Sequence, residues 1–377
     1  MENITLSNEQ NTAVHNFFEW FNCFNAYSKK FYFLAGYAGT GKTTLCKFII
    51  DELTALNKSV CCCAFTGKAA CNFFEKTGHP CSTIHSTIYT PRLEEDEVID
   101  WDLNFEDSPI LNCDLIIIDE VSMIYQGLWN DLLKYHTPIL VFGDPYQLPP
   151  VNNDVLFGMD SCDFVLEHIH RQALDNPLIQ LSMQVRQEKN IPFGNFNDKV
   201  IKCHIRDFDR KQLTEFDQVI CGRNITRQTL NKEIRKLLNY CYTIPAKGEK
   251  LICLRNNKKM NVFNGLILTT LEDIISFDSQ NGTFDTLLDY NGVAKRFTIF
   301  DDEFSRKSIR ADRWKILTNK PEICQFDFSY AISCHKSQGS EWSNVCVFDE
   351  SNCFKADKFK WLYTAITRAK DRLVIVA

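Results

Sequence analysis

The sequence predicts an α/β protein made of two parallel-sheet lobes, with a small β barrel inserted into the second lobe. Three observations lead to this prediction. Short apolar runs alternate with amphipathic stretches in the first half of the chain, which is typical of a parallel sheet covered by helices. Residues 248–325 instead contain short alternating segments with Asn-Gly pairs, and the α/β pattern returns after them. With 377 residues, the chain is long enough to bury more than one core.

The first lobe is predicted to span residues 1–164. Short apolar runs of this kind favour buried strands. The predicted strands are residues 31–35, 60–64, 115–119 and 139–143. The pattern breaks over residues 87–109, an acidic stretch that contains Glu94-Glu95-Asp96-Glu97. We interpret this stretch as a small insertion on the lobe surface, and both a solvated loop and a functional element remain open.

The second lobe is predicted to comprise residues 165–247 and 326–377, interrupted by the barrel at 248–325. Before the interruption, a strand at 217–221 precedes a helix at 223–240. After it, the predicted elements are strands at 326–333, 345–349 and 373–376 and a helix at 357–370. Three Asn-Gly pairs in the barrel segment are hairpin signals. They are Asn264-Gly265, Asn281-Gly282 and Asn291-Gly292.

Composition excludes several classes of protein. The net charge of -6 and the pI near 5.8 argue against a protein that coats nucleic acid by bulk electrostatics, so any nucleic-acid groove must be locally basic or based on stacking. The longest apolar runs are far shorter than the roughly 20 residues of a membrane helix. The start, Met1-Glu2-Asn3-Ile4, has neither a basic segment nor an apolar segment. A cytoplasmic location is therefore expected.

The 17 cysteines are interpreted as reduced and mostly buried, because they stand singly within apolar patterns. Cys61-Cys62-Cys63 lies in a predicted strand, where successive side chains face opposite ways and cannot converge on one metal. His79, Cys81 and His85 are not accompanied by a paired CxxC motif. No zinc site is therefore predicted.

The segment Gly36-Tyr37-Ala38-Gly39-Thr40-Gly41-Lys42-Thr43 matches the phosphate-binding P-loop at all its fixed positions, after a predicted strand. Its glycines let backbone N–H groups close around a phosphate at a helix N-terminus. Lys42 is expected to neutralise the β and γ phosphates, and Thr43 to offer its hydroxyl to Mg²⁺. ATP and Mg²⁺ are therefore the expected cofactors. The nucleotide-binding residues expected here are Gly36, Ala38, Gly39, Thr40, Gly41, Lys42, Thr43 and Thr44.

Two carboxylates, Asp119 and Glu120, follow the apolar run of the predicted strand at 115–119. The carboxyl ends of parallel strands form the edge of the sheet where ligands bind. We expect Asp119 to hold Mg²⁺ together with Thr43. We expect Glu120 to accept a proton from the water that attacks the γ-phosphate.

Further segments in a fixed order carry a resemblance to a known family. They are residues 6–10 (a glutamine motif), 64–70 (motif Ia), 82–85 (Ib), 119–123 (II), 143–150 (III), 170–172 (IV), 333–341 (V) and 363–370 (VI). With the P-loop, they resemble the motifs of superfamily 1 helicases, and within these the RecD/Dda-like branch of superfamily 1B, along nearly the whole chain. The resemblance implies RecA-like folds for the two lobes and an SH3-like fold for the barrel.

The resemblance also implies roles for individual residues of the nucleotide site. Gln10 would read the adenine, and Gly339 and Glu341 would lie near phosphate and ribose. Arg171 and Arg368 would reach the γ-phosphate across a cleft, where a fixed cation stabilises charge on the transferred group. A surface salt bridge is the alternative role for Arg171. Gln147 would sense the γ-phosphate, so the implied catalytic residues are Lys42, Glu120, Gln147, Arg171 and Arg368.

For nucleic acid, the resemblance implies contacts from Phe65, Thr66, His85 and His335, through stacking, hydroxyl groups and backbone amides. The family often has proline in motif Ia where this chain has Phe65, which leaves that local contact open. The barrel adds three candidate phosphate contacts, for which a solvated face is the alternative. These are Lys258, Lys259 and Arg296.

The implied function is that of an ATP-dependent DNA helicase moving 5′ to 3′, a direction that belongs to the branch. Single-stranded or forked duplex DNA is the expected partner, with a single-strand-binding or replication protein as a further candidate. A monomer suffices because one chain carries both lobes, and the compact length suits a phage enzyme.

The main alternative is a translocase that displaces bound proteins or remodels replication and recombination intermediates without processive unwinding. A binding protein with a dead ATPase site would not need an intact Lys42, and a small-molecule kinase would not need motifs V and VI.

Overall fold

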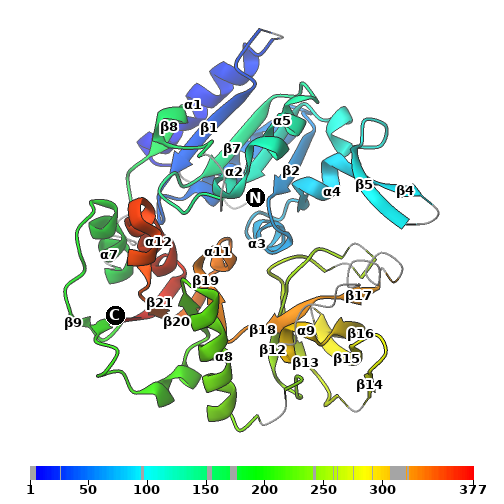
Figure 1. Ribbon diagram of the computed structural model, residues 1–377. Coiled ribbons are helices and arrows are strands. Elements are labelled where there is room, and N and C mark those ends of the chain that lie inside the picture. The colour runs from blue at the N-terminus through cyan, green and yellow to red at the C-terminus, as the bar shows by residue number, and fades with distance from the viewer. Residues whose placement is uncertain are drawn as a thin grey trace. The chain divides into compact units, whose positions relative to one another are not determined.

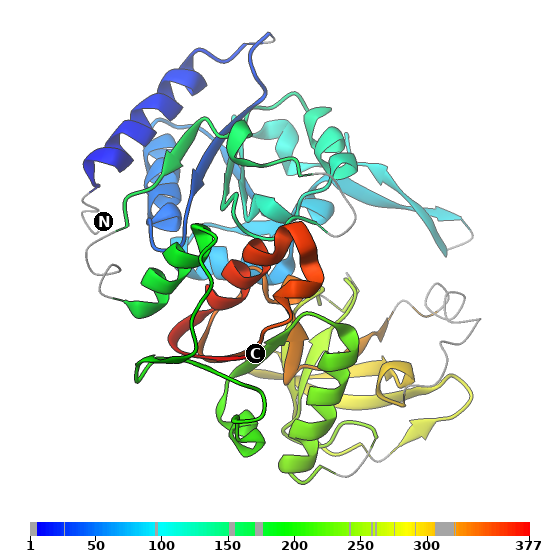
Figure 2. The same ribbon diagram turned by 60° about the vertical axis from the view of Figure 1, so that its left-hand side comes forward.

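The computed structural model describes residues 6–377 apart from residues 26, 95–96, 151–154, 170–175, 241–242, 258, 261, 275, 291, 306–319 and 321. The chain divides into two compact units. The first comprises residues up to 92 with 100–192 and 354–367, and the second comprises 93–99, 193–353 and 368–377. Their helices and strands are labelled in Figure 1 and seen from a second side in Figure 2.

A parallel sheet with strand order β3-β2-β6-β7-β1-β8 forms the centre of the first unit. The four strands predicted from apolar runs are confirmed, and β1 extends one residue further than predicted. All residues of β7 are buried, as expected for a strand covered on both faces. The strands are β1 (Phe31–Gly36), β2 (Val60–Ala64), β3 (Cys81–Thr83), β6 (Leu115–Asp119), β7 (Ile139–Gly143) and β8 (Phe164–Leu166).

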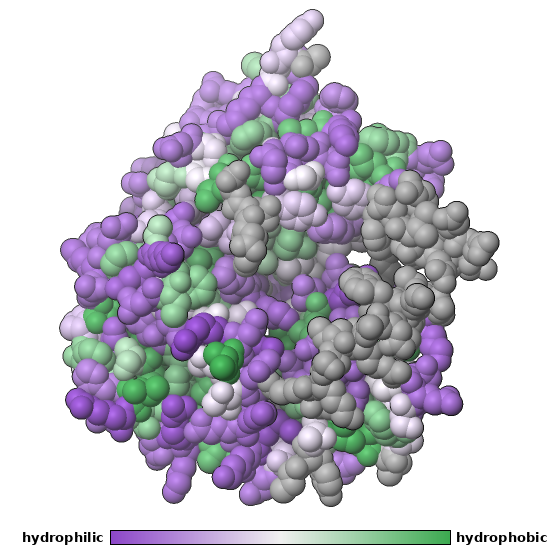
Figure 3. Space-filling view, in the orientation of Figure 1, coloured by the Kyte–Doolittle hydropathy of each residue, from purple (hydrophilic) through white to green (hydrophobic). Residues whose placement is uncertain are grey.

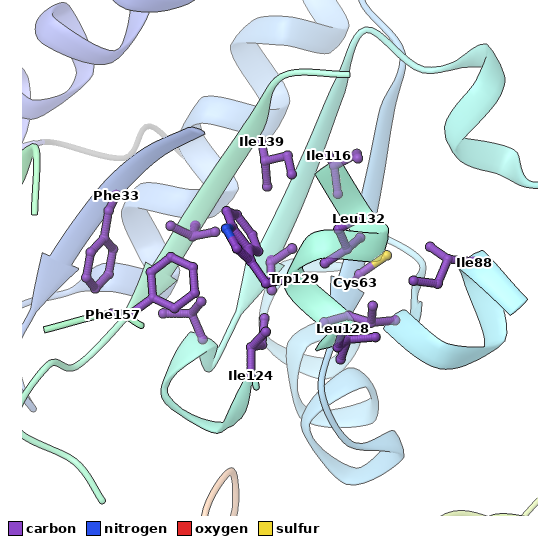
Figure 4. Packing of buried hydrophobic residues seen from close by; sticks show 14 of the residues in the cluster. Phe33, Cys63, Ile88, Ile116, Ile124, Leu128, Trp129, Leu132, Ile139 and Phe157 are labelled. Carbon is purple, nitrogen blue, oxygen red and sulfur yellow. The ribbon is translucent and has the colours of Figure 1, made fainter. Parts of the chain in front are cut away.

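Helices cover both faces of this sheet and create two hydrophobic cores. In β1, Leu34 belongs to one core and Phe33 to the other, because successive strand side chains point to opposite faces. Figure 4 shows the Phe33 core, where Trp129 and Phe157 pack edge to face with ring centroids 4.9 Å apart. The Leu34 core is covered by α1 (Asn8–Asn22), α2 (Lys42–Ala55) and α3 (Gly67–Thr77), and the Phe33 core by α4 (Ile84–Ile88) and α5 (Gln126–Leu133).

The acidic stretch predicted as an insertion forms a two-stranded sheet of β4 (Tyr89–Glu94) and β5 (Glu97–Leu103). β-Branched and aromatic residues within the stretch, such as Val98, Ile99 and Trp101, favour strand over loop. The insertion is therefore a pair of hydrogen-bonded strands, while Glu95 and Asp96 lie outside the described residues.

A second sheet, with strand order β19-β11-β20-β21-β10-β9, forms the centre of the second unit. Its pairs are parallel except β9 with β10. The predicted helix at 223–240 is α8 (Asn224–Leu237), which packs Leu230 and Ile234 into the core of this sheet. The strands are β9 (Gly194–Asn197), β10 (Val200–Cys203), β11 (Gln218–Cys221), β19 (Ala331–Ser333), β20 (Trp342–Phe348) and β21 (Ala369–Val376).

Three predicted boundaries differ from the structure. Residues near 165 belong to the first sheet, because β8 pairs with β1, so the second sheet starts at β9. The predicted helix at 357–370 is α12 (Lys358–Ile366), since residues from Ala369 onward pair with β20. Both α12 and α7 (Pro177–Arg186) belong to the first unit.

A third sheet, with strand order β17-β16-β15-β13-β12-β18, occupies the interrupted region. Its pairs are antiparallel except β16 with β17. Gly282 and Gly292 have positive φ in the turns on either side of β15, as the Asn-Gly pairs predicted, whereas Asn264-Gly265 lies in a longer connection. The strands are β12 (Lys250–Cys253), β13 (Ile267–Thr270), β14 (Phe277–Asp278), β15 (Thr283–Tyr290), β16 (Val293–Phe300), β17 (Ile323–Cys324) and β18 (Phe326–Phe328).

The predicted strand at 326–333 is two strands in different sheets. β18 pairs antiparallel with β12 of the third sheet, and β19 pairs parallel with β11 of the second. Ser329 and Tyr330 lie between them, so the interruption extends about three residues beyond the predicted end at 325. Because residues on both sides of this junction are buried, the pattern of hydrophobicity does not show that the chain passes from one sheet to another.

Helix α8 joins the second and third sheets through three buried polar side chains spaced four residues apart, which places them on one face. Arg227 contacts the Asp327 carboxylate at 2.5 Å. The Asn231 amide donates to and accepts from the backbone of Ala331, each at 2.9 Å. Arg235 forms two hydrogen bonds to the Glu249 carboxylate, at 2.6 and 2.9 Å. The third sheet is therefore fixed to helix α8 by charge pairs.

The surface drawn in colour in Figure 3 is mostly hydrophilic, with small hydrophobic patches. Across the described part of the chain, no helix combines the length and apolar character needed to cross a membrane. The described cysteines are free thiols, and most are at least partly buried. The remaining short helices are α9 (Asp302–Ser305), α11 (Cys334–Ser337), η1 (Pro109–Asn112), η2 (Val121–Met123), η3 (Met159–Ser161), η4 (Arg210–Glu215) and η5 (Ser351–Asp357).

Candidate nucleotide site

The candidate nucleotide site lies at the carboxyl edge of the first sheet. Gly36 ends β1, Asp119 ends β6 and Asp144 follows β7, and these three strands are parallel. Their ends therefore meet at one edge, where parallel sheets bind ligands. The structure brings the P-loop, the acidic pair and motif III together at the sheet edge where the acidic pair was expected.

The P-loop is a tight turn between β1 and α2. Gly39 and Gly41 have φ of 82° and 79°, a left-handed conformation that favours glycine. A Cβ on Gly36 would lie 2.8 Å from the Thr40 hydroxyl oxygen, so this position leaves no room for a side chain. The Lys42 ammonium donates to the carbonyls of Gly36 and Tyr37 at 2.8 and 2.9 Å. The lysine is thus held over the loop that would receive the phosphates.

Gln10, predicted to read the adenine, is tied to the same loop. It belongs to a capping box at the start of α1, where its side chain accepts from Ser7 N–H and the Ser7 hydroxyl accepts from Gln10 N–H. Its amide nitrogen donates to the Thr40 carbonyl at 3.4 Å. The residue is 3% exposed. Gln10 therefore connects the N-terminal helix to the P-loop.

Asp119 and Glu120 form an acidic pair beside the start of α2. Burial, and then the charge of Glu120, raises the pKa of Asp119 to about 6. The charge of Lys42 opposes this rise, and Asp119 in turn helps to raise the pKa of Cys46 in α2, so the carboxylate lies within electrostatic range of the helix that carries Thr43. A carboxylate and a hydroxyl are oxygen donors of the kind that Mg²⁺ prefers. Among the described residues, no group of three or more His, Cys, Asp or Glu side chains could hold a metal by itself.

A pH profile of kcat/KM for ATP hydrolysis is expected to show an acid limb near pH 6. Asp119 is protonated below its pKa of about 6 and charged above it, and a carboxyl group must be deprotonated to bind a cation. Because kcat/KM reports groups of the free enzyme, it should fall about tenfold per pH unit below that pKa and level off above it. Unfolding measured at each pH controls for acid denaturation. A value that stays constant between about pH 5 and pH 7 would contradict the assignment.

Motif III follows β7 as a short turn. One Asp144 carboxylate oxygen accepts from Tyr146 N–H at 3.0 Å, and Asp144 itself is 1% exposed. Burial raises the pKa of Asp144. Gln147 is 8% exposed, and its carbonyl oxygen has no hydrogen-bond partner among the described residues. It lines a small pocket together with Ser122, whose buried hydroxyl is also unpartnered. The amide of Gln147 therefore keeps hydrogen-bonding capacity that the protein does not use.

Motif VI begins within helix α12, which packs on the motif III turn in the first unit. The Tyr363 hydroxyl contacts Asp144, and the Thr364 hydroxyl oxygen accepts from Leu148 N–H at 2.9 Å. On another side, the Arg186 guanidinium of α7 lies over the Tyr37 ring, 3.3 Å from its centroid. Sequence reasoning assigned no role to Asp144, Tyr363 or Arg186. Asp144 and Tyr363 lie within motifs III and VI. This was the one feature of the sequence that could have pointed to them.

The residues predicted to contact nucleic acid in the first unit form an aromatic cluster. The Phe65 and His85 rings lie 6.0 Å apart, and Tyr125 lies within 6.5 Å of both. The His85 ring is also 5.8 Å from Tyr89. Thr66 caps α3, where its hydroxyl oxygen accepts from Ala69 N–H at 3.1 Å. The structure groups these residues and adds Tyr125 and Tyr89, which the sequence reasoning missed.

In the second unit, motifs V and VI meet. A guanidinium nitrogen of Arg368 donates to the Ser340 carbonyl at 3.3 Å, and Arg368 is 4% exposed. The Glu341 carboxylate lies 3.5 Å from the Lys370 ammonium. Gly339 has a φ of 72°, and His335 lies half-buried in α11. Arg171 falls outside the described residues.

Several weaker candidates already have partners. The ammonium of Lys259 lies 3.3 Å from Glu322, and the guanidinium of Arg296 lies 3.0 Å from Glu272. Lys258 falls outside the described residues. His79, considered for zinc, lies 2.9 Å from the Asp51 carboxylate.

Comparisons with known families match two segments of the chain. Residues 22–153 match the AAA domain, and residues 328–376 match the UvrD-like helicase C-terminal domain. The first match contains the P-loop and the acidic pair. The second contains β19 to β21 and therefore motifs V and VI.

Individual relatives are helicases. The chain is 26% identical to the ATP-dependent RecD2 DNA helicase of Deinococcus radiodurans over 90% of its own length and 46% of that protein. It is 32% identical to the ATP-dependent DNA helicase dda of Enterobacteria phage T4, over 46% of its own length and 40% of that protein. The chain thus spans about half the length of the RecD2 protein. The Pif1 helicase from Bacteroides, solved with ADP-AlF3 and single-stranded DNA, shares the fold at a TM-score of 0.56 and 18% identity, covering 99% of this chain and 92% of that chain.

Proposed function

We propose that this chain, a relative of the RecD, Dda and Pif1 helicases of superfamily 1B, is an ATP-dependent DNA helicase that translocates on single-stranded DNA, in the 5′ to 3′ direction of its branch. One observation carries the proposal. The P-loop, the acidic pair and the Gln147 turn meet at one sheet edge, and that edge belongs to a chain whose relatives are helicases.

Each residue of the site has a physical role in this proposal. Lys42 and the P-loop amides neutralise and orient the phosphates. Thr43 and Asp119 hold Mg²⁺, which supplies further positive charge at the transferred phosphoryl group. Glu120 is the base that accepts a proton from the attacking water. The amide group of Gln147 senses the γ-phosphate. Gln10 and the P-loop backbone bind the rest of the nucleotide.

Residues of motifs IV, V and VI supply the remaining parts. We assign Arg171 and Arg368 to charge stabilisation in the transition state, and Gly339 and Glu341 to nucleotide contacts. Arg368 already has a fixed position through Ser340, which supports a role that depends on geometry. If ATP favours one arrangement of the two units over another, hydrolysis of ATP and release of the products change that arrangement. This change is the translocation step.

The track-binding residues are proposed to be Phe65, Thr66, His85 and His335. Aromatic faces can stack on bases of any sequence, and Tyr125 extends the aromatic set near Phe65 and His85. The third sheet is proposed to be the SH3-like barrel of the family, which would brace the strand. Lys259 and Arg296 are exposed there, although both are already paired. A monomer working on single-stranded or forked DNA in the cytoplasm is the simplest form of this proposal.

The test is ATP hydrolysis by the parent protein with and without single-stranded DNA, at low salt where phosphate contacts are strongest. A helicase should hydrolyse ATP at least about tenfold faster when the strand is present, because its productive state is assembled on the track. Single-stranded RNA of the same length is the matched control. Hydrolysis that no strand stimulates would overturn the proposal.

A second assay separates the helicase from its main alternative. Tailed duplexes with either a 5′ or a 3′ overhang, and a strand that carries a bound protein, are offered in parallel. Unwinding from the 5′ overhang supports the helicase. Displacement of the bound protein without unwinding would instead favour a translocase that remodels replication or recombination intermediates.

A further inference from the structure

We propose that Tyr363 is a positioning residue for ATP hydrolysis, whose hydroxyl joins the phosphate loop and motif III to helix α12 in one hydrogen-bonded unit. This inference rests on the proposed function of the nucleotide site. It concerns a group that touches neither the metal nor the reacting atoms. The hydrogen bonds of Tyr363 and Thr364 that carry it lie within the first unit.

The Tyr363 hydroxyl uses both its donor and its acceptor capacity. It donates to one carboxylate oxygen of Asp144 at 2.5 Å and accepts from the backbone N–H of Ala38 at 3.1 Å. Ala38 belongs to the P-loop, whereas Asp144 opens the motif III turn. The three residues are far apart in sequence, and Tyr363 and Asp144 are each 1% exposed. One phenol therefore fixes a P-loop amide and a buried carboxylate at the same time.

The next residue of the helix holds the other end of the motif III turn. The Thr364 hydroxyl oxygen accepts from Leu148 N–H at 2.9 Å. The turn from Asp144 to Leu148 is thus held at both ends by α12, and Gln147 lies between the two attachments. The position of the Gln147 amide, whose oxygen has no hydrogen-bond partner in the described part of the chain, is set by this clamp.

The same helix leads directly into the arginine of motif VI. α12 ends at Ile366, and Arg368 follows two residues later, where it bonds to the Ser340 carbonyl of motif V. Tyr363 and Thr364 therefore connect the phosphate loop and Gln147 to the segment that carries Arg368. A change in the loop on phosphate binding would be passed to that segment through two hydrogen bonds.

Removing only the hydroxyl, in Tyr363→Phe, tests this role. Loss of a hydrogen bond to a buried carboxylate should lower kcat for DNA-stimulated hydrolysis by about tenfold to a hundredfold. Affinity for ADP–aluminium fluoride should fall by a similar factor and affinity for ADP by less than about threefold, because Gln147 acts only on the γ position. In the protein without nucleotide, the Ala38 amide should exchange with deuterium about tenfold faster than in the parent.

Two further variants make the result specific. Tyr135→Phe also removes a buried hydroxyl of the first unit, one that donates to the Ile88 and Asn104 carbonyls at 3.0 and 2.9 Å, away from the site. It should lower stability without changing either affinity or the exchange of Ala38. Asp144→Asn combined with Tyr363→Phe should be no worse than the more damaging single variant, because both remove the same link.

The outcomes separate the two proposals. A parent protein that binds no ADP would overturn the proposed function, and the role of Tyr363 in hydrolysis with it. A parent that binds and hydrolyses normally, while Tyr363→Phe keeps its kcat, its affinities and its Ala38 exchange within about twofold, would overturn the role of Tyr363 alone. Equal losses for ADP and ADP–aluminium fluoride, or additive effects with Asp144→Asn, would also overturn it.

Discussion

Replacing Lys42 with alanine is expected to lower ATP hydrolysis about a thousandfold or more, to the background of the assay. The Lys42 ammonium is held over the P-loop by the Gly36 and Tyr37 carbonyls, and its charge acts on both Asp119 and Asp144. Charge that is fixed in advance where charge develops in the transition state usually accelerates a reaction more than any other single effect. The rate of phosphate release with saturating single-stranded DNA measures the loss.

The matched control for Lys42 is Lys47→Ala in the same helix. Lys47 lies further along α2, where its ammonium donates to the Thr77 carbonyl and lies 3.4 Å from Asp51. Its loss should leave hydrolysis within about threefold of the parent. If Lys42→Ala kept a tenth of the parent rate while folding normally, the P-loop could not be the site of hydrolysis.

Arg235→Met is expected to destabilise the second unit by about 3 to 5 kcal/mol, because it leaves the Glu249 charge buried without its partner. Glu249 is 0% exposed and accepts two hydrogen bonds from Arg235, at 2.6 and 2.9 Å. The Arg235 guanidinium also lies over the Phe328 ring, 3.9 Å from its centroid. Thermal unfolding should show a transition lowered by about 10 °C.

Arg296→Met provides the comparison for this stability prediction. Its partner Glu272 lies 3.0 Å away, but the Arg296 side chain is 57% exposed, and exposed ion pairs contribute little. The melting temperature should therefore stay within about 2 °C of the parent. Equal melting temperatures for Arg235→Met and Arg296→Met would show that the α8 link does not hold the third sheet in place.

Local patterns in the sequence determined the parts of the first sheet that depend on short stretches of chain. Runs such as 60–64 and 139–143 are apolar throughout, so hydrophobicity alone marks them as strands. The P-loop and the Asp119-Glu120 pair are recognisable because their chemistry requires fixed residue types at fixed spacing. Parallel connection of these strands then places the two motifs at one sheet edge without further information.

Only the tertiary structure decided how segments distant in sequence combine. The run at 326–333 is almost continuously buried, yet β18 and β19 join different sheets, because the choice of strand partner depends on the whole sheet. Similarly, α12 follows the second-lobe strands in sequence but packs in the first unit. The Tyr363 hydroxyl donates a hydrogen bond to Asp144, which lies 219 residues away in the sequence. A tyrosine carries no local sign of its hydrogen-bond partner, because that partner is selected by burial after the chain has folded.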